Sequence, residues 1–165
     1  MASTHVASDQ VWQALEKASY AVVSFVGPDG EPRSSGVVYA LVERRVYVVT
    51  AADSLKARHL QDGQTLAVTV PVRRGGLLSL LFPIPPASVS FRARATIHAP
   101  GSVDIETLSK RLARMLPEQR KQGAVLELEP VGTFLTYGIG VSLREMIDPA
   151  KALARIPVDA GLDGR

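Results

Sequence analysis

The sequence has 165 residues, of which 46% are hydrophobic and 21% charged, a composition typical of a globular chain and not of a disordered one. It contains no cysteine, which excludes disulfides and cysteine-ligated zinc sites. The formal net charge of +3 is too small to choose between an acidic small ligand, a nucleic acid and an ordinary solvated surface.

Targeting and domain organisation follow from the same inventory. The polar N-terminus lacks the apolar core of a secretory signal, and the longest apolar stretch, Leu77–Ala87, is shorter than the about 20 residues that span a bilayer. We therefore expect a cytoplasmic protein. The length predicts one domain over 1–165, with a barrel at about 8–141 and a tail at 142–165.

The chain opens with a predicted helix. Four apolar residues have helical spacing: Val11, Trp12, Leu15 and Ala18. They predict a helix over Asp9–Ala18 with Ser8 as its N-cap. A turn at Gly27–Gly30 separates the first two of several predicted strands.

Strand patterns dominate the rest of the chain. The predicted strands are Tyr20–Val26, Arg33–Leu41, Val46–Thr50, Thr65–Val72, Ser88–His98, Ala124–Leu128 and Gly132–Tyr137. We expect the second and third to form a hairpin. Helices are predicted over Leu55–Leu60, capped by Ser54, and over Ile105–Met115, closed by Pro117. A sheet of about six such strands commonly closes into an antiparallel barrel to remove its edges.

Two neighbouring segments could hold an anion. One is the strand that starts at Arg33, and the other is the strand end Val49-Thr50 with the following Ser54–Arg58. Free N–H groups at a helix start attract a phosphate, and Lys56 would add a full charge. By spacing alone, a solvated surface explains these residues equally well.

The order of elements and these two segments resemble the pyridoxamine 5'-phosphate oxidase-like family of FMN-binding split barrels, over about residues 8–137. The resemblance implies a mainly β fold with a few helices, a six-stranded antiparallel split barrel. It also implies that certain residues line the cofactor site: Arg33, Ser35, Gly36, Val37, Val38, Val49, Thr50, Ser54, Lys56, Arg58 and Ser88. The implied cofactor is FMN or the deazaflavin F-420, and the choice between them stays open.

The same resemblance sets the expected function. It implies an oxidoreductase that transfers a hydride to a small molecule, and no residue pair marks a catalytic acid or base. Pyridoxamine 5'-phosphate oxidase itself has an Arg-x-His substrate motif near its C-terminal end. This sequence lacks that motif and has Gly138–Ser142 in its place. The alternative is a non-enzymatic module that binds a lipid, a tetrapyrrole or a regulatory ligand.

Partners are expected from the resemblance and from one apolar segment. The family implies a homodimer with a cofactor groove shared between two barrels. Leu77–Phe82 is unusually apolar for a loop, which favours burial in the barrel or under a partner over a membrane-touching patch. The scarcity of aromatic residues argues against a nucleic-acid partner, and the spacing of His59 and His98 is not that of a metal site.

Overall fold

The computed structural model describes residues 7–51, 53–54, 58–73 and 86–159. Its strands are β1 (Tyr20–Val26), β2 (Pro32–Val38), β3 (Ala40–Val42), β4 (Arg45–Thr50), β5 (Thr65–Val72), β6 (Ala87–His98), β7 (Ala124–Tyr137) and β8 (Leu153–Pro157). Its helices are α1 (Ser8–Lys17), α4 (Ile105–Leu108), α5 (Lys110–Met115), α6 (Glu118–Lys121), the short 3-10 helix η1 (Glu145–Ile147) and α7 (Pro149–Ala152).

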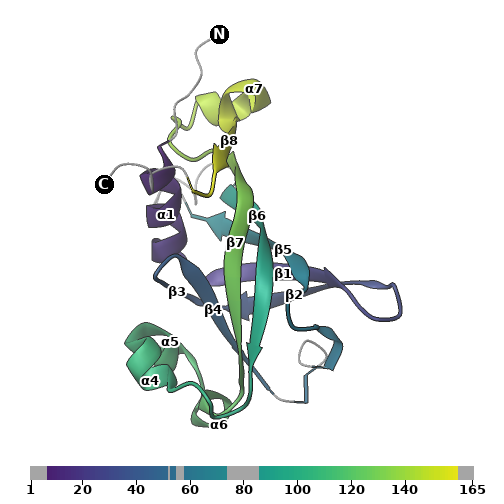
Figure 1. The fold of residues 1–165 in the computed structure, drawn as a ribbon. Coiled ribbons are helices and arrows are strands. Elements are labelled where there is room, and N and C mark those ends of the chain that lie inside the picture. The colour runs from purple at the N-terminus through teal and green to yellow at the C-terminus, as the bar shows by residue number, and fades with distance from the viewer. Residues whose placement is uncertain (1–6, 52, 55–57, 74–85, 160–165) are drawn as a thin grey trace. The chain divides into compact units, whose positions relative to one another are not determined.

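The described strands form one sheet in the order β2-β1-β5-β6-β7-β4-β3, with β8 added beside β7 (Figure 1). The pairs β1–β2, β3–β4, β4–β7 and β7–β8 are antiparallel. The predicted fold class, mainly β and antiparallel with a few short helices, is therefore confirmed. The sheet has eight strands in the described residues, where a six-stranded barrel was expected. Of the seven predicted strand segments, one is divided and the last two are joined, and the tail adds another strand.

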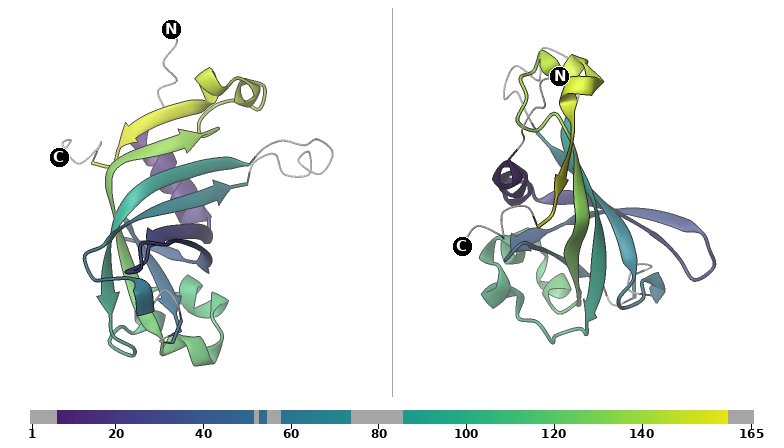
Figure 2. Two further views of the ribbon diagram at one scale, coloured as in Figure 1. Left: turned by 90° about the vertical axis from the view of Figure 1, so that its right-hand side faces the viewer. Right: turned by 45° about the horizontal axis from the view of Figure 1, so that its top comes forward.

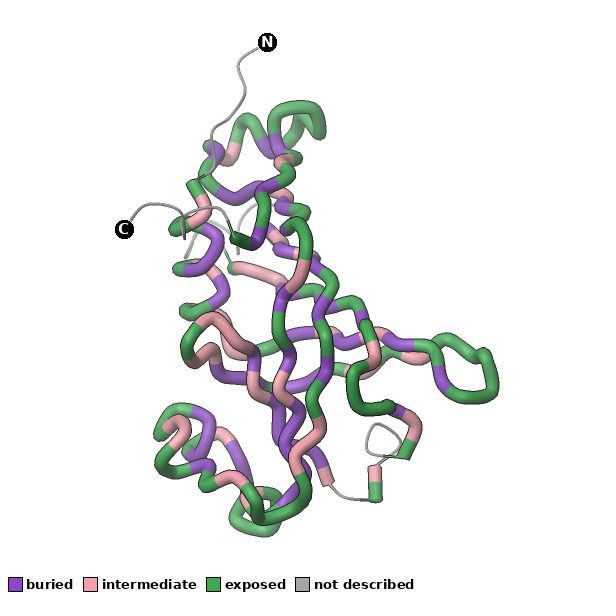
Figure 3. The backbone as a smooth tube through the Cα atoms, in the orientation of Figure 1, coloured by how far each residue is buried: buried purple, intermediate pink, exposed green. Residues whose placement is uncertain are grey.

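Burial alternates along the strands, as the pleat of a half-buried sheet requires. Figure 3 shows this alternation along the backbone, and in β6 the buried positions include Val89, Phe91, Ala93 and Ala95. Apolar residues at every second position are typical of a strand with one buried face.

The predicted strand Arg33–Leu41 is interrupted at Tyr39. Its first part, β2, pairs with β1, and its last part, β3, pairs with β4 across Glu43 and Arg44. Both turn residues have positive φ, 48° and 62°, the conformation of a tight hairpin turn. Tyr39 itself is fully buried, and its N–H donates to the carbonyl of Ser19. The expected hairpin therefore involves only the end of the predicted strand.

The predicted helix Ile105–Met115 is broken at Ser109. This residue has extended backbone (φ −159°, ψ 106°), and its Oγ accepts a hydrogen bond from the N–H of Leu112 at 3.2 Å. Ser109 thus ends α4 and caps α5. At the N-terminus the expected cap is also wrong by one residue, because α1 begins at Ser8 and the Ala7 N–H donates to Oε1 of Gln10.

The two last predicted strands are one continuous strand, β7, with Gly132 at φ 78° near its middle. The first part of β7 pairs with β4, and the part after Gly132 pairs with β8, as Figure 2 shows. The tail therefore contributes a strand of the sheet, which the sequence pattern did not predict.

The chain divides into two compact units. One comprises Met1–Ala18, Thr69–Phe91 and Gly132–Arg165, and the other Ser19–Val68 and Arg92–Val131. In the first, the Phe134 ring makes edge-to-face contacts with Trp12 and Phe91, with centroids 5.0 and 5.4 Å apart. The expectation of a single domain stays a prediction.

The second unit has its own apolar cluster. Leu112, Ala113 and Leu116 of the helical segment pack with Ala40, Val49 and Val125 of β3, β4 and β7.

No helix in the described part of the chain is long and apolar enough to cross a bilayer.

Candidate functional site

The end of β4 brings two predicted site residues together. Thr50 is 3% exposed, and its Oγ1 lies 2.7 Å from Oγ of Ser54. The Ser54 N–H donates to the carbonyl of Ala51, and the Arg58 N–H donates to the carbonyl of Ser54. The chain thus turns sharply after β4 and presents two adjacent hydroxyls. Lys56 and the first half of the predicted helix Leu55–Leu60, residues 55–57, lie outside the described residues.

Close packing behind Thr50 fixes the position of its backbone. A Cβ on Gly123 would lie 2.3 Å from the Thr50 carbonyl oxygen, so only glycine fits there. The neighbouring Val49 belongs to the apolar cluster against α5. Of the two predicted residues at this strand end, Thr50 therefore contacts Ser54 in the turn, whereas the Val49 side chain packs in the apolar core.

The pleat divides the predicted site residues of β2 between two faces of the sheet. Val37 pairs with Ala21 and Ser35 pairs with Val23, so both lie on the face that β1 buries. Gly36 and Val38 lie on the opposite face, where a Cβ on Gly36 would lie 2.4 Å from the Tyr20 hydroxyl. The side chains of this run do not all face one ligand.

Arg33 is bound within its own hairpin. Its Nη1 and Nη2 donate to the two carboxylate oxygens of Asp29 at 2.7 and 2.5 Å, and Nη1 also donates to the carbonyl of Glu31. The hydrogen bonds from Arg33 hold the pKa of the Asp29 carboxyl well below its usual range, with help from the Glu31 N–H. The same pairing raises the pKa of Arg33.

Ser88 lies in the other compact unit, on β6. It is half-buried, and it shares its strand face with Ser90, whose Oγ lies 3.1 Å from Oγ1 of Thr69. Arg58 is exposed at the helical turn after Ser54. The described contacts therefore join Thr50, Ser54 and Arg58, while Arg33 interacts with its own turn.

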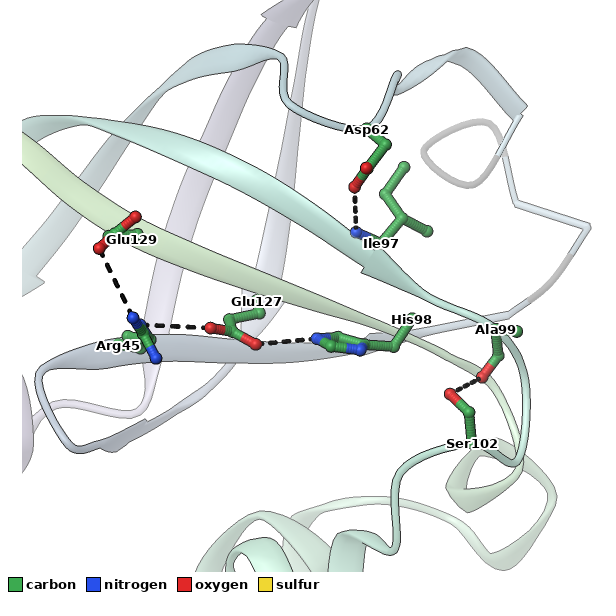
Figure 4. Close-up of polar contacts among 8 residues, drawn as sticks. All are labelled: Arg45, Asp62, Ile97, His98, Ala99, Ser102, Glu127 and Glu129. Atoms are coloured by element: carbon green, nitrogen blue, oxygen red, sulfur yellow. Dashed lines mark hydrogen bonds and ion pairs between the residues drawn. The ribbon is translucent and has the colours of Figure 1, made fainter.

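Sequence analysis missed a chain of charged residues across β4, β7 and β6. Figure 4 shows Glu127 between His98 and Arg45: its Oε2 lies 2.8 Å from Nε2 of His98, and its Oε1 lies 3.2 Å from Nε of Arg45. Arg45 also lies 3.6 Å from Glu129. Glu127 within a predicted strand and Glu129 just after it were a signal, but their partners depend on strand register, which was not predicted.

Within the ranges that the structure describes, no three residues of the types His, Asp and Glu gather closely enough to hold an ion. A carboxylate, an imidazole and a guanidinium in a row stabilise strand pairing by cross-strand contacts.

Comparison with known proteins gives a family and a fold. The family described as "Pyridoxamine 5'-phosphate oxidase" matches residues 7–137. A search of curated proteins found no match. Several solved structures share the fold at low sequence identity.

Three of these structures show the range of proteins that share this fold. The heme storage protein HutZ from Vibrio cholerae is 14% identical, with 80% of this chain and 95% of that chain covered and a TM-score of 0.61. An F-420 reductase is 18% identical, with coverages of 74% and 93% and a TM-score of 0.53. An FAD binding protein from Mycobacterium smegmatis is 12% identical, with coverages of 76% and 90% and a TM-score of 0.54. Because the family match spans most of the chain, this protein belongs to the pyridoxamine 5'-phosphate oxidase family, whose fold is the split barrel.

Proposed function

We propose that this protein binds a phosphorylated flavin, FMN or the deazaflavin F-420, and acts as an oxidoreductase on a small molecule. The observation that carries the proposal is the hydroxyl pair of Thr50 and Ser54 at the end of β4, directly before Lys56. The F-420 reductase and the FAD binding protein that share this fold support a flavin-type ligand.

The described residues fit the phosphate end of such a cofactor. Each hydroxyl can donate to a phosphate oxygen once it gives up the bond to the other, and Arg58 lies one turn further along the chain. Lys56 would supply the neutralising charge. The bound flavin would supply the hydride chemistry, and the protein would hold, orient and shield it from water.

Titration of the purified protein with FMN and with F-420 tests the proposal directly. We expect one of the two to bind well below millimolar concentration, which corresponds to more than roughly 4 kcal/mol. Binding of neither cofactor below millimolar would remove the basis of the proposal. Reduction of the bound cofactor, followed by its absorbance, then tests for oxidoreductase activity.

Lys56 gives the sharpest test of the phosphate site. We expect Lys56→Ala to weaken FMN binding by about 1.5–3 kcal/mol, because a charge-assisted hydrogen bond is lost. Lys17, at the end of α1, offers a control: Lys17→Ala makes the same change of charge in the other compact unit and should leave affinity unchanged. Equal affinities for Lys56→Ala and the unmodified protein would place Lys56 on ordinary surface.

A tetrapyrrole-binding module is the second candidate. His98 is 32% exposed, and a carboxylate orients its ring, as is typical of metal-binding histidines. The heme storage protein of the same fold supports this candidate. Titration with haem should shift the haem absorption band in the unmodified protein and not in His98→Ala. The same spectrum in both proteins would exclude His98 as a ligand.

A further inference from the structure

We propose that Asp29 sets the affinity of Arg33 for anionic ligands, because its carboxylate already accepts hydrogen bonds from the two terminal nitrogens that a ligand phosphate would use. This inference rests on the proposed function together with the family resemblance, which implies that Arg33 lines the cofactor site. It adds an affinity-determining residue outside the predicted cofactor-binding residues.

The geometry of the pair is that of a bound anion. Both terminal nitrogens of Arg33 contact Asp29, one carboxylate oxygen each, in the parallel arrangement that guanidinium groups also use for phosphate. Nη1 makes a further bond to the carbonyl of Glu31. A phosphate that binds these nitrogens must therefore displace Asp29.

The hairpin turn accommodates the pair closely. A Cβ on Gly27 would lie 1.9 Å from Nη1 of Arg33 and 2.7 Å from Oδ1 of Asp29, so a side chain at position 27 would push the ends of both side chains out of their present positions. Gly27 does not have positive φ, which leaves this close approach as the reason for glycine. The Glu31 N–H also donates to Oδ1 of Asp29, which orients the carboxylate toward Arg33.

Bonds to the rest of the second unit hold the turn in place. The side-chain amide of Gln64 donates to the carbonyl of Val26 at 2.8 Å, and the Gly27 N–H donates to the carbonyl of Glu31. Asp29 is 48% and Arg33 25% exposed, so the pair is accessible to a ligand from solvent. Exposure also keeps the pair weak enough to exchange, because exposed ion pairs contribute little net free energy.

The test compares Asp29→Asn with Glu31→Gln. Both substitutions remove one negative charge from the same turn, but Arg33 bonds the side chain of Asp29 and only the backbone carbonyl of Glu31. At fixed ionic strength, we expect Asp29→Asn to tighten FMN binding by roughly three- to fivefold, the range that an exposed ion pair allows. Glu31→Gln should change it by less than about twofold, and riboflavin, which lacks the phosphate, should bind all variants equally.

A second measurement does not depend on cofactor binding. Inorganic phosphate is titrated while NMR follows the Nε–H signal of Arg33, which should respond at lower phosphate concentration in Asp29→Asn than in the unmodified protein. If FMN binds no variant but this shift occurs, the inference stands and the proposed function fails. If FMN and phosphate act equally on Asp29→Asn and the unmodified protein, the inference is overturned whether or not the protein uses a flavin.

Discussion

Single residues at the proposed site have roles that depend on their neighbours. Thr50 is almost fully buried, yet its hydroxyl bonds a half-buried serine four residues later. Arg33, which the family resemblance placed in the cofactor site, donates to the carboxylate of Asp29 in its own turn. The geometry makes Thr50 and Ser54 the centre of the candidate site. At Arg33, a ligand phosphate would have to compete with the Asp29 carboxylate.

Removing the Thr50 hydroxyl should separate binding from stability. We expect Thr50→Val to lower the free energy of unfolding by about 1 kcal/mol, because one hydrogen bond is lost at nearly constant volume. It should also weaken FMN binding.

Thr136→Val is the matched control, since Thr136 is equally buried and its hydroxyl donates to the carbonyl of Ala154. Urea denaturation and FMN titration of both variants give the comparison. Equal FMN affinities in the two variants would remove Thr50 from the site.

The Asp29–Arg33 pair also predicts a pH dependence. The folded-state pKa of Asp29 is lowered, so the pair adds stability above the pKa of the unfolded chain and loses it as pH falls through the folded-state value. The carboxyl ¹³C signal of Asp29 should therefore show no protonation between pH 6 and about pH 3. In Arg33→Gln the midpoint should rise toward about 3.9. Arg45→Gln serves as the control, and an unchanged midpoint in Arg33→Gln would contradict the observed pairing.

At the scale of elements, breaks in predicted segments position the site. The interruption at Tyr39 lets the end of a long strand pattern leave β1 and pair with β4. The break at Ser109 lets the short α5 pack its apolar residues against the strand that ends at Thr50. The break at Tyr39 follows tertiary packing, whereas the break at Ser109 also has a local cause in the cap that its hydroxyl provides.

The Ser109 break can be tested by removing its cap. Ser109→Ala should lower the free energy of unfolding by about 1 kcal/mol, because the Leu112 N–H loses its acceptor. Ser102→Ala is the control, since the Ser102 hydroxyl is exposed and donates to the carbonyl of Ala99 in a turn. Denaturation midpoints of both variants show whether the loss of stability comes from removal of the helix cap or from the loss of any serine hydroxyl.

For the whole molecule, we propose a homodimer. Tyr20, Val26 and Val38 are 48%, 53% and 36% exposed on the β1–β2 hairpin, and a second copy could cover them. The apolar segment Leu77–Phe82, which first motivated the dimer, lies outside the described residues. The last predicted strand, Gly132–Tyr137, pairs with β8 of its own chain.

Light scattering tests the dimer. At micromolar concentration, the mass should be twice the chain mass of 17.7 kDa. Tyr20→Glu should favour the monomer, because it places a charge on the apolar hairpin face, whereas Leu153→Glu, on β8, should leave the mass unchanged. A stable monomer that still binds FMN tightly would rule out a cofactor site shared between chains.

The sequence by itself determined the positions of several strands and, in β6, the residues that face the core. Period-two alternation in β6 and the turn residues after β1 are local signals, because each depends on neighbours a few positions away. The strands Tyr20–Val26 and Thr65–Val72 were predicted to the residue for the same reason. The Thr50–Ser54 pair was also within reach, since both residues lie in one short segment.

Tertiary structure alone decided which strands pair and what the charged side chains contact. The pairing of β7 with β4 and the addition of β8 depend on contacts between distant segments, so no local pattern specifies them. His98 and Glu127 meet because their strands bring together residues 29 positions apart. Arg33 donates to both carboxylate oxygens of Asp29, a contact that the folded turn shows and that the sequence pattern did not predict.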